Sequence, residues 1–177
     1  FFTKDNYFSV ASEKAKIVTS ISMFYDLENP VSFAKEVASI LAEDGVWVIE
    51  QSYLPAMIRQ NSYDTICHEH LEYYSLTAVE YILQQAGMTL IDASQNEVNG
   101  GSVRLAAVHK KSSLTSKISP EAIWLIEQEK NHDIHSDNSF EIFQKNVDRQ
   151  KIDLVKLLQE LKKKGKTVIG YGASTKG

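Results

Sequence analysis

Two short apolar segments on either side of an amphipathic helix place the strongest constraint on the fold. The segment "KAKIVTSISMF" (14–24) has a β-branched apolar centre, which predicts a strand. A helix follows, with Asn29 as its N-cap, Pro30 in its first turn and Gly45 at its end. The next segment, "VWVIEQ" (46–51), is apolar on both faces at its start, as in a central parallel strand covered by helices. This β-α-β order predicts an α/β domain.

The pattern continues with one more helix and two more strands. Residues 75–86 have apolar side chains at helical spacing, and Gly87 is the expected end of that helix. Strands are predicted at 88–94 and 102–110, and the turn residues between them favour a tight, antiparallel reversal. The α/β domain is therefore expected to close at about residue 110.

Two helices and a final strand are predicted beyond that domain. A helix is expected from Pro120 to about Lys130 and a longer one over 139–163, whose apolar stripe is typical of a packing face. The last segment, "KTVIGYGASTKG", indicates a strand and a glycine-rich loop that open a second nucleotide-fold-like unit. Because the sequence starts without methionine and stops at that loop, we expect an excerpt of a longer protein. The expected domains are 1–111, 112–165 (a helical linker region) and 166–177.

Composition limits the classes of protein. A chain of 177 residues with 43% hydrophobic residues fits one globular domain, or one domain plus part of another. No apolar run approaches the roughly 20 residues that cross a bilayer, and no secretory signal is evident, so we expect a cytoplasmic protein without a membrane partner. The net charge of −4 argues against nucleic acid. Cys67 is the only cysteine, which excludes a disulfide or a cysteine-rich zinc site within this chain. The oligomeric state is left open.

The run "NSYDTICHEHLEYYSL" (61–76) carries the densest chemistry. In an extended segment His68 and His70 point to the same side and could supply two metal ligands, but no third ligand is evident and we predict no metal. A histidine oriented by a neighbouring carboxylate is also suited to acid–base catalysis. The tyrosines of the run could then bind an oxyanion or a sugar hydroxyl; they are Tyr63, Tyr73 and Tyr74. The alternative is a hydrogen-bonded polar cluster that holds a long loop in place.

The position of the run favours function. The connection 52–74 is longer than the ~12 to 15 residues of ordinary loops, and it leaves the carboxyl end of a predicted central strand, where open α/β sheets bind ligands. The segment "SMFYDLENP" follows the preceding strand at the same edge, so Tyr25 and Asp26 could line the same crevice, with Phe24 there or in the core. By themselves, the "NEVNGG" turn and the terminal G-x-G are weak signals.

These segments together resemble a known family. "IVTSISMFYDLENP", "VWVIEQSYLP", "NSYDTICHEHLEYYSL", "NEVNGGSVRL" and "VIGYGASTKG" are similar, in this order, to the S-adenosylmethionine-dependent C-methyltransferases of deoxysugar biosynthesis, which act on nucleotide-linked sugars. The resemblance implies a class I methyltransferase-like (Rossmann-like) partial sheet, followed by helices and the first strand of a second α/β domain. It also implies a preceding zinc module and glycine-rich cofactor loop that this chain lacks.

The resemblance implies chemistry as well. Members remove a proton next to a sugar ketone, and the enolate then attacks the methyl group of the cofactor. The base maps onto His70, with Glu69 as its companion and His68 beside it, and Tyr25 or Asp26 stands where a histidine often follows the strand. Cys67 departs from the family pattern, which has a tyrosine at that place.

The remaining implied contacts are with the two substrates. S-adenosylmethionine is expected at Ser22, Met23 and Phe24. The nucleotide sugar is expected at Tyr63, Cys67, Tyr73, Asn99, Gly100, Gly101, Gly172 and Lys176. Three alternatives stay open: a non-catalytic nucleotide-sugar binding module, a methyltransferase acting on a sugar oxygen, and a metal-dependent hydrolase using His68 and His70.

Overall fold

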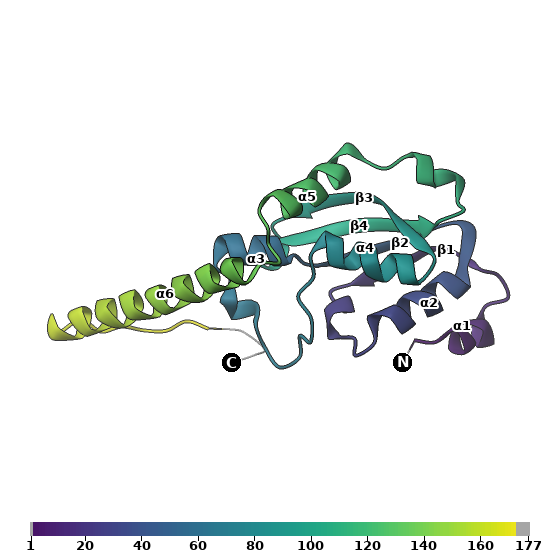
Figure 1. Cartoon of the computed structure of the whole chain (residues 1–177). Coiled ribbons are helices and arrows are strands. Elements are labelled where there is room, and N and C mark those ends of the chain that lie inside the picture. The colour runs from purple at the N-terminus through teal and green to yellow at the C-terminus, as the bar shows by residue number, and fades with distance from the viewer. Residues whose placement is uncertain (1, 173–177) are drawn as a thin grey trace.

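A four-stranded mixed sheet forms the centre of the protein (Figure 1). The computed structural model describes residues 2–172. The strands are arranged in the order β1-β2-β4-β3, and their bounds are β1 Ala15–Ile21, β2 Leu41–Ser52, β3 Met88–Asn96 and β4 Ser102–His109. β1 pairs with β2 in parallel, whereas β4 is antiparallel to both β2 and β3. The first three strands therefore run in one direction, and the predicted α/β class and antiparallel final pair are confirmed.

Two helices cover one face of this sheet, α2 (Pro30–Ile40) and α4 (Leu76–Gln85) (Figure 1). Each begins at a side-chain cap: Asn29, the expected one, accepts through Oδ1 from the Ser32 amide at 2.9 Å, and Ser75 accepts through Oγ from the Ala78 amide at 3.1 Å. The core lies between these helices and the sheet; its largest side chains include Phe24, Trp47, Ile49, Leu76, Leu83, Met88 and Leu105. Removing this apolar surface from water is the main stabilising term of the fold.

Helix α5 (Pro120–Asn131) is part of the same domain as the sheet. It packs beside β3 and buries Ala122, Leu125 and Glu129. Ser119 caps it as expected, and the Ser119 amide donates to the Ile91 carbonyl at 2.8 Å. The shorter elements are α1 (Lys4–Val10), α3 (Leu54–Gln60) and four 3₁₀ turns at Phe24–Asp26, Tyr63–Thr65, Val98–Gly100 and Ser113–Ser116.

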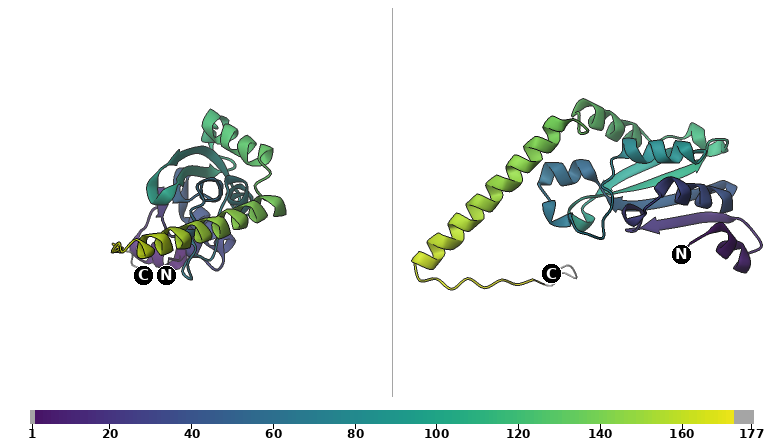
Figure 2. Two further views of the ribbon diagram at one scale, coloured as in Figure 1. Left: turned by 90° about the vertical axis from the view of Figure 1, so that its left-hand side faces the viewer. Right: turned by 60° about the horizontal axis from the view of Figure 1, so that its bottom comes forward.

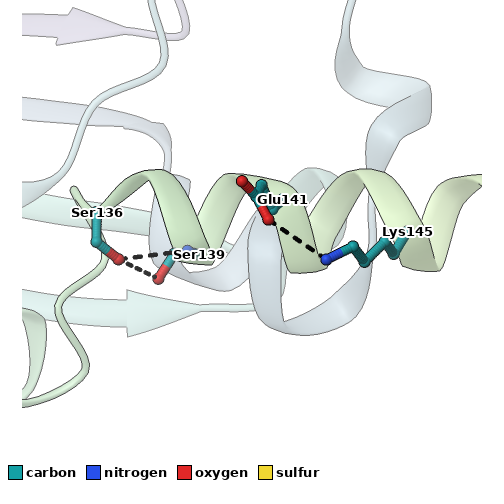
Figure 3. Close-up of polar contacts among 4 residues, drawn as sticks. All are labelled: Ser136, Ser139, Glu141 and Lys145. Carbon is teal, nitrogen blue, oxygen red and sulfur yellow. Dashed lines mark hydrogen bonds and ion pairs between the residues drawn. The ribbon is translucent and has the colours of Figure 1, made fainter.

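Helix α6 (Asp137–Lys163) extends away from the sheet (Figure 2). Ser136 caps it through the Ser139 amide at 3.3 Å, and Lys145 pairs with Glu141 one turn earlier at 3.3 Å (Figure 3). None of its residues is buried. The expected packing stripe is therefore uncovered within the described residues, although the helix itself was predicted correctly.

Two further expectations are corrected. Helix α2 was expected to end at Gly45, but it ends at Ile40, and β2 already begins at Leu41. Gly45 lies inside the strand, where a Cβ would come within 2.8 Å of the Leu41 side chain and 2.9 Å of the Ala15 carbonyl, so close strand approach explains the glycine. The final strand is also absent from the described residues, because 166–172 form neither helix nor strand. Within the described part of the chain, no helix has the length and apolar character needed to cross a membrane.

Candidate functional site

The carboxyl edge of the sheet brings the predicted segments together. β1 and β2 are parallel, so Ser22–Asp26 and Tyr53 follow them at the same edge. Ser102 pairs with both Ser52 and Asn96, which places the β3–β4 connection there too. The connection 61–74 is held at this edge by backbone hydrogen bonds, from the Leu71 and Glu72 amides to the Tyr25 carbonyl at 3.0 and 3.1 Å and from the Leu54 amide to the Tyr74 carbonyl at 2.9 Å.

His70 lies half-buried against Tyr25, with ring centroids 4.4 Å apart. Its Nδ1 is 3.0 Å from the Thr65 carbonyl oxygen. A carbonyl can only accept, so this contact assigns the proton of the neutral ring to Nδ1 and the basic lone pair to Nε2. The ring is thus oriented by the loop backbone. An imidazole in this tautomer is equipped to take a proton through Nε2.

The carboxylate expected to orient His70 contacts a different histidine. Glu69 Oε1 is 4.0 Å from His68 Nε2, and the side chains are 62% and 88% exposed. Such an exposed pair is worth little and does not hold either group in place. The Thr65 carbonyl therefore performs the orienting role that was predicted for Glu69, and His68 extends into solvent.

The tyrosines of the run occupy distinct places. Tyr73 Oη accepts from the Cys67 amide at 3.3 Å and lies 3.5 Å from the Thr65 carbonyl, on the edge of the His70 ring. Tyr63 is half-buried at the start of its 3₁₀ turn. Tyr74 is in the core, where burial first, and then the charge of Glu72, raises the pKa of its phenol, so the hydroxyl stays protonated. Of these three tyrosines, Tyr73 is the one whose ring adjoins that of His70.

The predicted cofactor residues divide into two groups. Ser22 is exposed and has φ 52°, an uncommon left-handed conformation that turns the chain directly after β1, and Met23 is half-buried beside it. Phe24 is 0% exposed, with its ring centroid 5.6 Å from that of Trp47 and 5.4 Å from that of Tyr74. Its side chain is a core residue and cannot contact a cofactor, which corrects the expectation for Phe24.

The glycines of the β3–β4 connection serve close packing. A Cβ on Gly101, which has φ 119°, would lie 2.7 Å from the Cβ of Ala56 in α3. Its carbonyl accepts from the Tyr53 amide at 3.1 Å. Gly100 faces Ser62 at 3.5 Å, and Asn99 is exposed with φ 52°. The backbone here is thus locked to α3, and its contact with a substrate stays a prediction.

One other predicted contact is not brought to this edge, and another lies outside the described residues. Gly172 lies in the irregular segment after α6, where a Cβ would meet nothing within 4 Å. Lys176 lies outside the described residues. No group of three or more His, Cys, Asp or Glu side chains that could hold a metal ion occurs between residues 2 and 172.

Sequence reasoning missed the most extensively bonded buried group. Glu129 of α5 is 2% exposed and accepts from Tyr53 Oη at 2.7 Å, the Leu76 amide at 2.7 Å and the Thr77 amide at 2.8 Å. Burial and the nearby Glu129 carboxylate raise the pKa of the Tyr53 phenol, which therefore remains a donor. These bonds attach α5 to the N-terminus of α4. A glutamate within a helical pattern gives no signal that distinguishes it from an exposed one.

A cavity of 280 Å³ lies beside this cluster, between α3, α5 and the start of α6. Arg59, Trp124 and His132 are among its lining residues. None of the predicted catalytic, substrate or cofactor residues lines it, although Tyr53, which follows β2 at the carboxyl edge, does.

The chain belongs to the methyltransferase domain family, whose model matches residues 2–93, just over half of the 177. Residues 97–177 match the model of the C-methyltransferase C-terminal domain. A curated relative, the C-methyltransferase NovU of Streptomyces niveus, is 28% identical over 163 residues, which cover 92% of this chain and 38% of that protein. The resemblance to C-methyltransferases is therefore confirmed, and the chain spans well under half the length of this relative.

Solved structures show partial likeness. An S-adenosylmethionine-dependent methyltransferase from Clostridium acetobutylicum is 11% identical with a TM-score of 0.44, and the match covers 56% of this chain and 60% of that one. The methyltransferase solved with the Haloferax volcanii Trm112 activator is 14% identical with a TM-score of 0.46, and 54% of each chain is covered.

Proposed function

We propose that the protein containing this chain transfers a methyl group from S-adenosylmethionine to a carbon of a nucleotide-linked keto-deoxysugar. The observation that carries the proposal is His70, whose Nδ1 faces the Thr65 carbonyl and whose ring packs on Tyr25 at the carboxyl edge of the sheet. The family match supports methyl transfer to carbon, because residues 97–177 match a C-methyltransferase domain.

The reaction needs a base close to neutral pKa and a donor for the oxygen that becomes negative. Nε2 of His70 takes the proton from the carbon next to the ketone, and the C–H electron pair forms the enolate. The Tyr73 ring stands at a steep angle to that of His70, and its hydroxyl, which donates weakly to the Thr65 carbonyl at 3.5 Å, would turn to donate to the enolate oxygen. The enolate carbon would then form the new C–C bond with the methyl group as the S–CH₃ bond breaks, its electron pair returning to sulfur to leave uncharged S-adenosylhomocysteine. Because the Nδ1 proton of His70 is directed at the Thr65 carbonyl, Nε2 serves as the base while Tyr73 serves as the hydrogen-bond donor.

The residues at the end of β1 fit part of a cofactor site. The left-handed turn at Ser22 leaves its side chain exposed at the carboxyl edge, with Met23 half-buried beside it. When bound, S-adenosylmethionine supplies an electrophilic methyl group. Ser22 and Met23 would hold the cofactor on the side of the sheet edge next to Tyr25, so that substrate and cofactor meet near His70.

The test uses the full-length protein, S-adenosylmethionine and a panel of thymidine diphosphate-linked 4-keto sugars. We expect transfer to a sugar carbon, with His70→Ala abolishing both transfer and solvent exchange of the acidic sugar proton while cofactor affinity is retained. His132→Ala, at an exposed histidine after α5, serves as the matched control and should keep wild-type rates.

Two results would contradict the proposal. Undiminished proton exchange in His70→Ala would remove His70 as the base. A methyl group found on a sugar oxygen in the product's NMR spectrum would replace C-methylation by O-methylation, and binding of the nucleotide sugar without any transfer would favour a non-catalytic binding module.

A further inference from the structure

Two buried side chains have polar atoms without a hydrogen-bond partner among the described residues: Tyr74, at its hydroxyl, and Gln51, at both polar atoms of its carboxamide. Six polar or charged side chains are buried there, and five of them have hydrogen-bond partners: Ser20, Ser75, Ser102, Ser112 and Glu129. The sixth is Gln51, which is 1% exposed and whose Oε1 and Nε2 both have no hydrogen-bond partner. A buried carboxamide that bonds to nothing is costly and calls for a physical reason.

Gln51 lies where β2 meets the candidate site. Burial alternates along β2, so Gln51 shares a face with Trp47 and Ile49 and is the last of the three before the carboxyl edge. The Phe24 ring lies 5.6 Å from that of Trp47, which places the Phe24–Tyr25 turn over the same face. His70 packs on Tyr25. The unpaired amide is thus on the His70 side of the sheet, at the strand end that the site occupies.

We propose that Gln51 is a specificity-determining residue of the acceptor site, and that its carboxamide hydrogen-bonds a ring hydroxyl of the keto sugar. This inference rests on the proposed function. A carboxamide offers a donor and an acceptor side by side, which matches a hydroxyl that both accepts from Nε2 and donates to Oε1. An apolar side chain of the same size would offer neither bond.

Because Gln51 is 1% exposed, the proposal requires the neighbouring 61–74 connection to shift when the sugar binds. Two hydrogen bonds lie within this connection. One joins His70 Nδ1 to the Thr65 carbonyl, and the other joins the Cys67 amide to Tyr73 Oη. The connection is joined to the end of β1 through the Leu71 and Glu72 amides on the Tyr25 carbonyl. A shift would break these bonds and the bond from the Leu54 amide to the Tyr74 carbonyl, but no strand pairing, and sugar binding would have to stabilise the shifted position.

The experiment compares the full-length wild type with Gln51→Met, which keeps the side-chain length and removes both hydrogen-bonding groups. Gln95→Met is the matched control, because Gln95 is a half-buried strand glutamine in β3. The thermal unfolding midpoint is measured without substrate. kcat/KM is measured with thymidine diphosphate-4-keto-6-deoxyglucose and with its 2-deoxy and 3-deoxy analogues.

We expect Gln51→Met to raise the unfolding midpoint, because an unpaired buried amide is replaced by an apolar group. We also expect it to lower kcat/KM for the hydroxylated sugar by roughly three- to tenfold for each of the two hydrogen bonds lost. The loss should vanish for the one analogue that lacks the bonded hydroxyl. Gln95→Met should leave the preference among the three sugars unchanged.

Three results would overturn the inference. A lowered midpoint would show that Gln51 is satisfied in the free protein, for example by a buried water. An unchanged preference among the three sugars would show that Gln51 does not contact the hydroxyls. If the wild type transfers no methyl group to any keto sugar, the proposed function fails and this inference with it, whereas transfer with equal preference in both proteins overturns the role of Gln51 alone.

Discussion

Replacing Glu129 by glutamine should destabilise the protein by about 2–6 kcal/mol, because two buried donors lose their acceptor at about 1–3 kcal/mol each. Oε1 accepts from Tyr53 Oη and the Leu76 amide, and Oε2 accepts from the Thr77 amide and hydroxyl. The new NH₂ group must face one of these pairs. If it faces Thr77, that hydroxyl can rotate to accept, so the Thr77 amide is the principal loss and the lower end of the range applies.

The assay is urea unfolding followed by circular dichroism, together with hydrogen exchange at the Leu76 and Thr77 amides. For a chain of this length the loss corresponds to a drop of about 4–24 °C in the thermal midpoint. Glu127→Gln on the exposed face of the same helix is the control and should stay within about 0.5 kcal/mol of the wild type. A Glu129→Gln protein as stable as this control would refute the view that the buried carboxylate fastens α5 to α4.

Two more outcomes are expected. Gly101→Ala should cost about 1–3 kcal/mol in urea unfolding, because its Cβ would lie 2.7 Å from that of Ala56 at φ 119°, and a wild-type midpoint would contradict the close approach. Tyr74→Phe bears on pH: burial raises the phenol's pKa above the usual 10.0, so its contribution to the free energy of unfolding is fully present below pH 10 and declines at higher pH as the unfolded state ionises. The variant should therefore lose less stability than the wild type between about pH 10 and 11, and parallel pH profiles would count against this reasoning.

Periodicity and capping predicted the secondary structure well because both are local properties. Asn29, Ser75 and Ser119 begin helices as expected, and each accepts a hydrogen bond from the amide three residues later. Gly45 misled because glycine also occurs where two backbones approach closely, and that approach depends on Ala15 in another strand. A local signal cannot distinguish these two uses.

The candidate site was predicted in position more than in detail. The strand order brings His70, Tyr25 and the end of β1 together, as expected from parallel strands sharing a carboxyl edge. Which atom orients His70 could not be foreseen, because the Thr65 carbonyl reaches it through the local path of the loop. Gln51 and Glu129 gave no signal either, since a polar residue's burial and partners depend on distant elements.

The reversed strand β4 has a consequence for how this chain can be divided. It lies between β2 and β3 and is bonded to both, yet it follows them in sequence. The two family models meet between residues 93 and 97, just before it. A protein expressed only as far as that junction would lack the one strand that joins its third strand to the first two, and the ribosome must likewise release His109 before the sheet can close. A cut made at the junction of the two models would therefore yield pieces that depend on each other to fold.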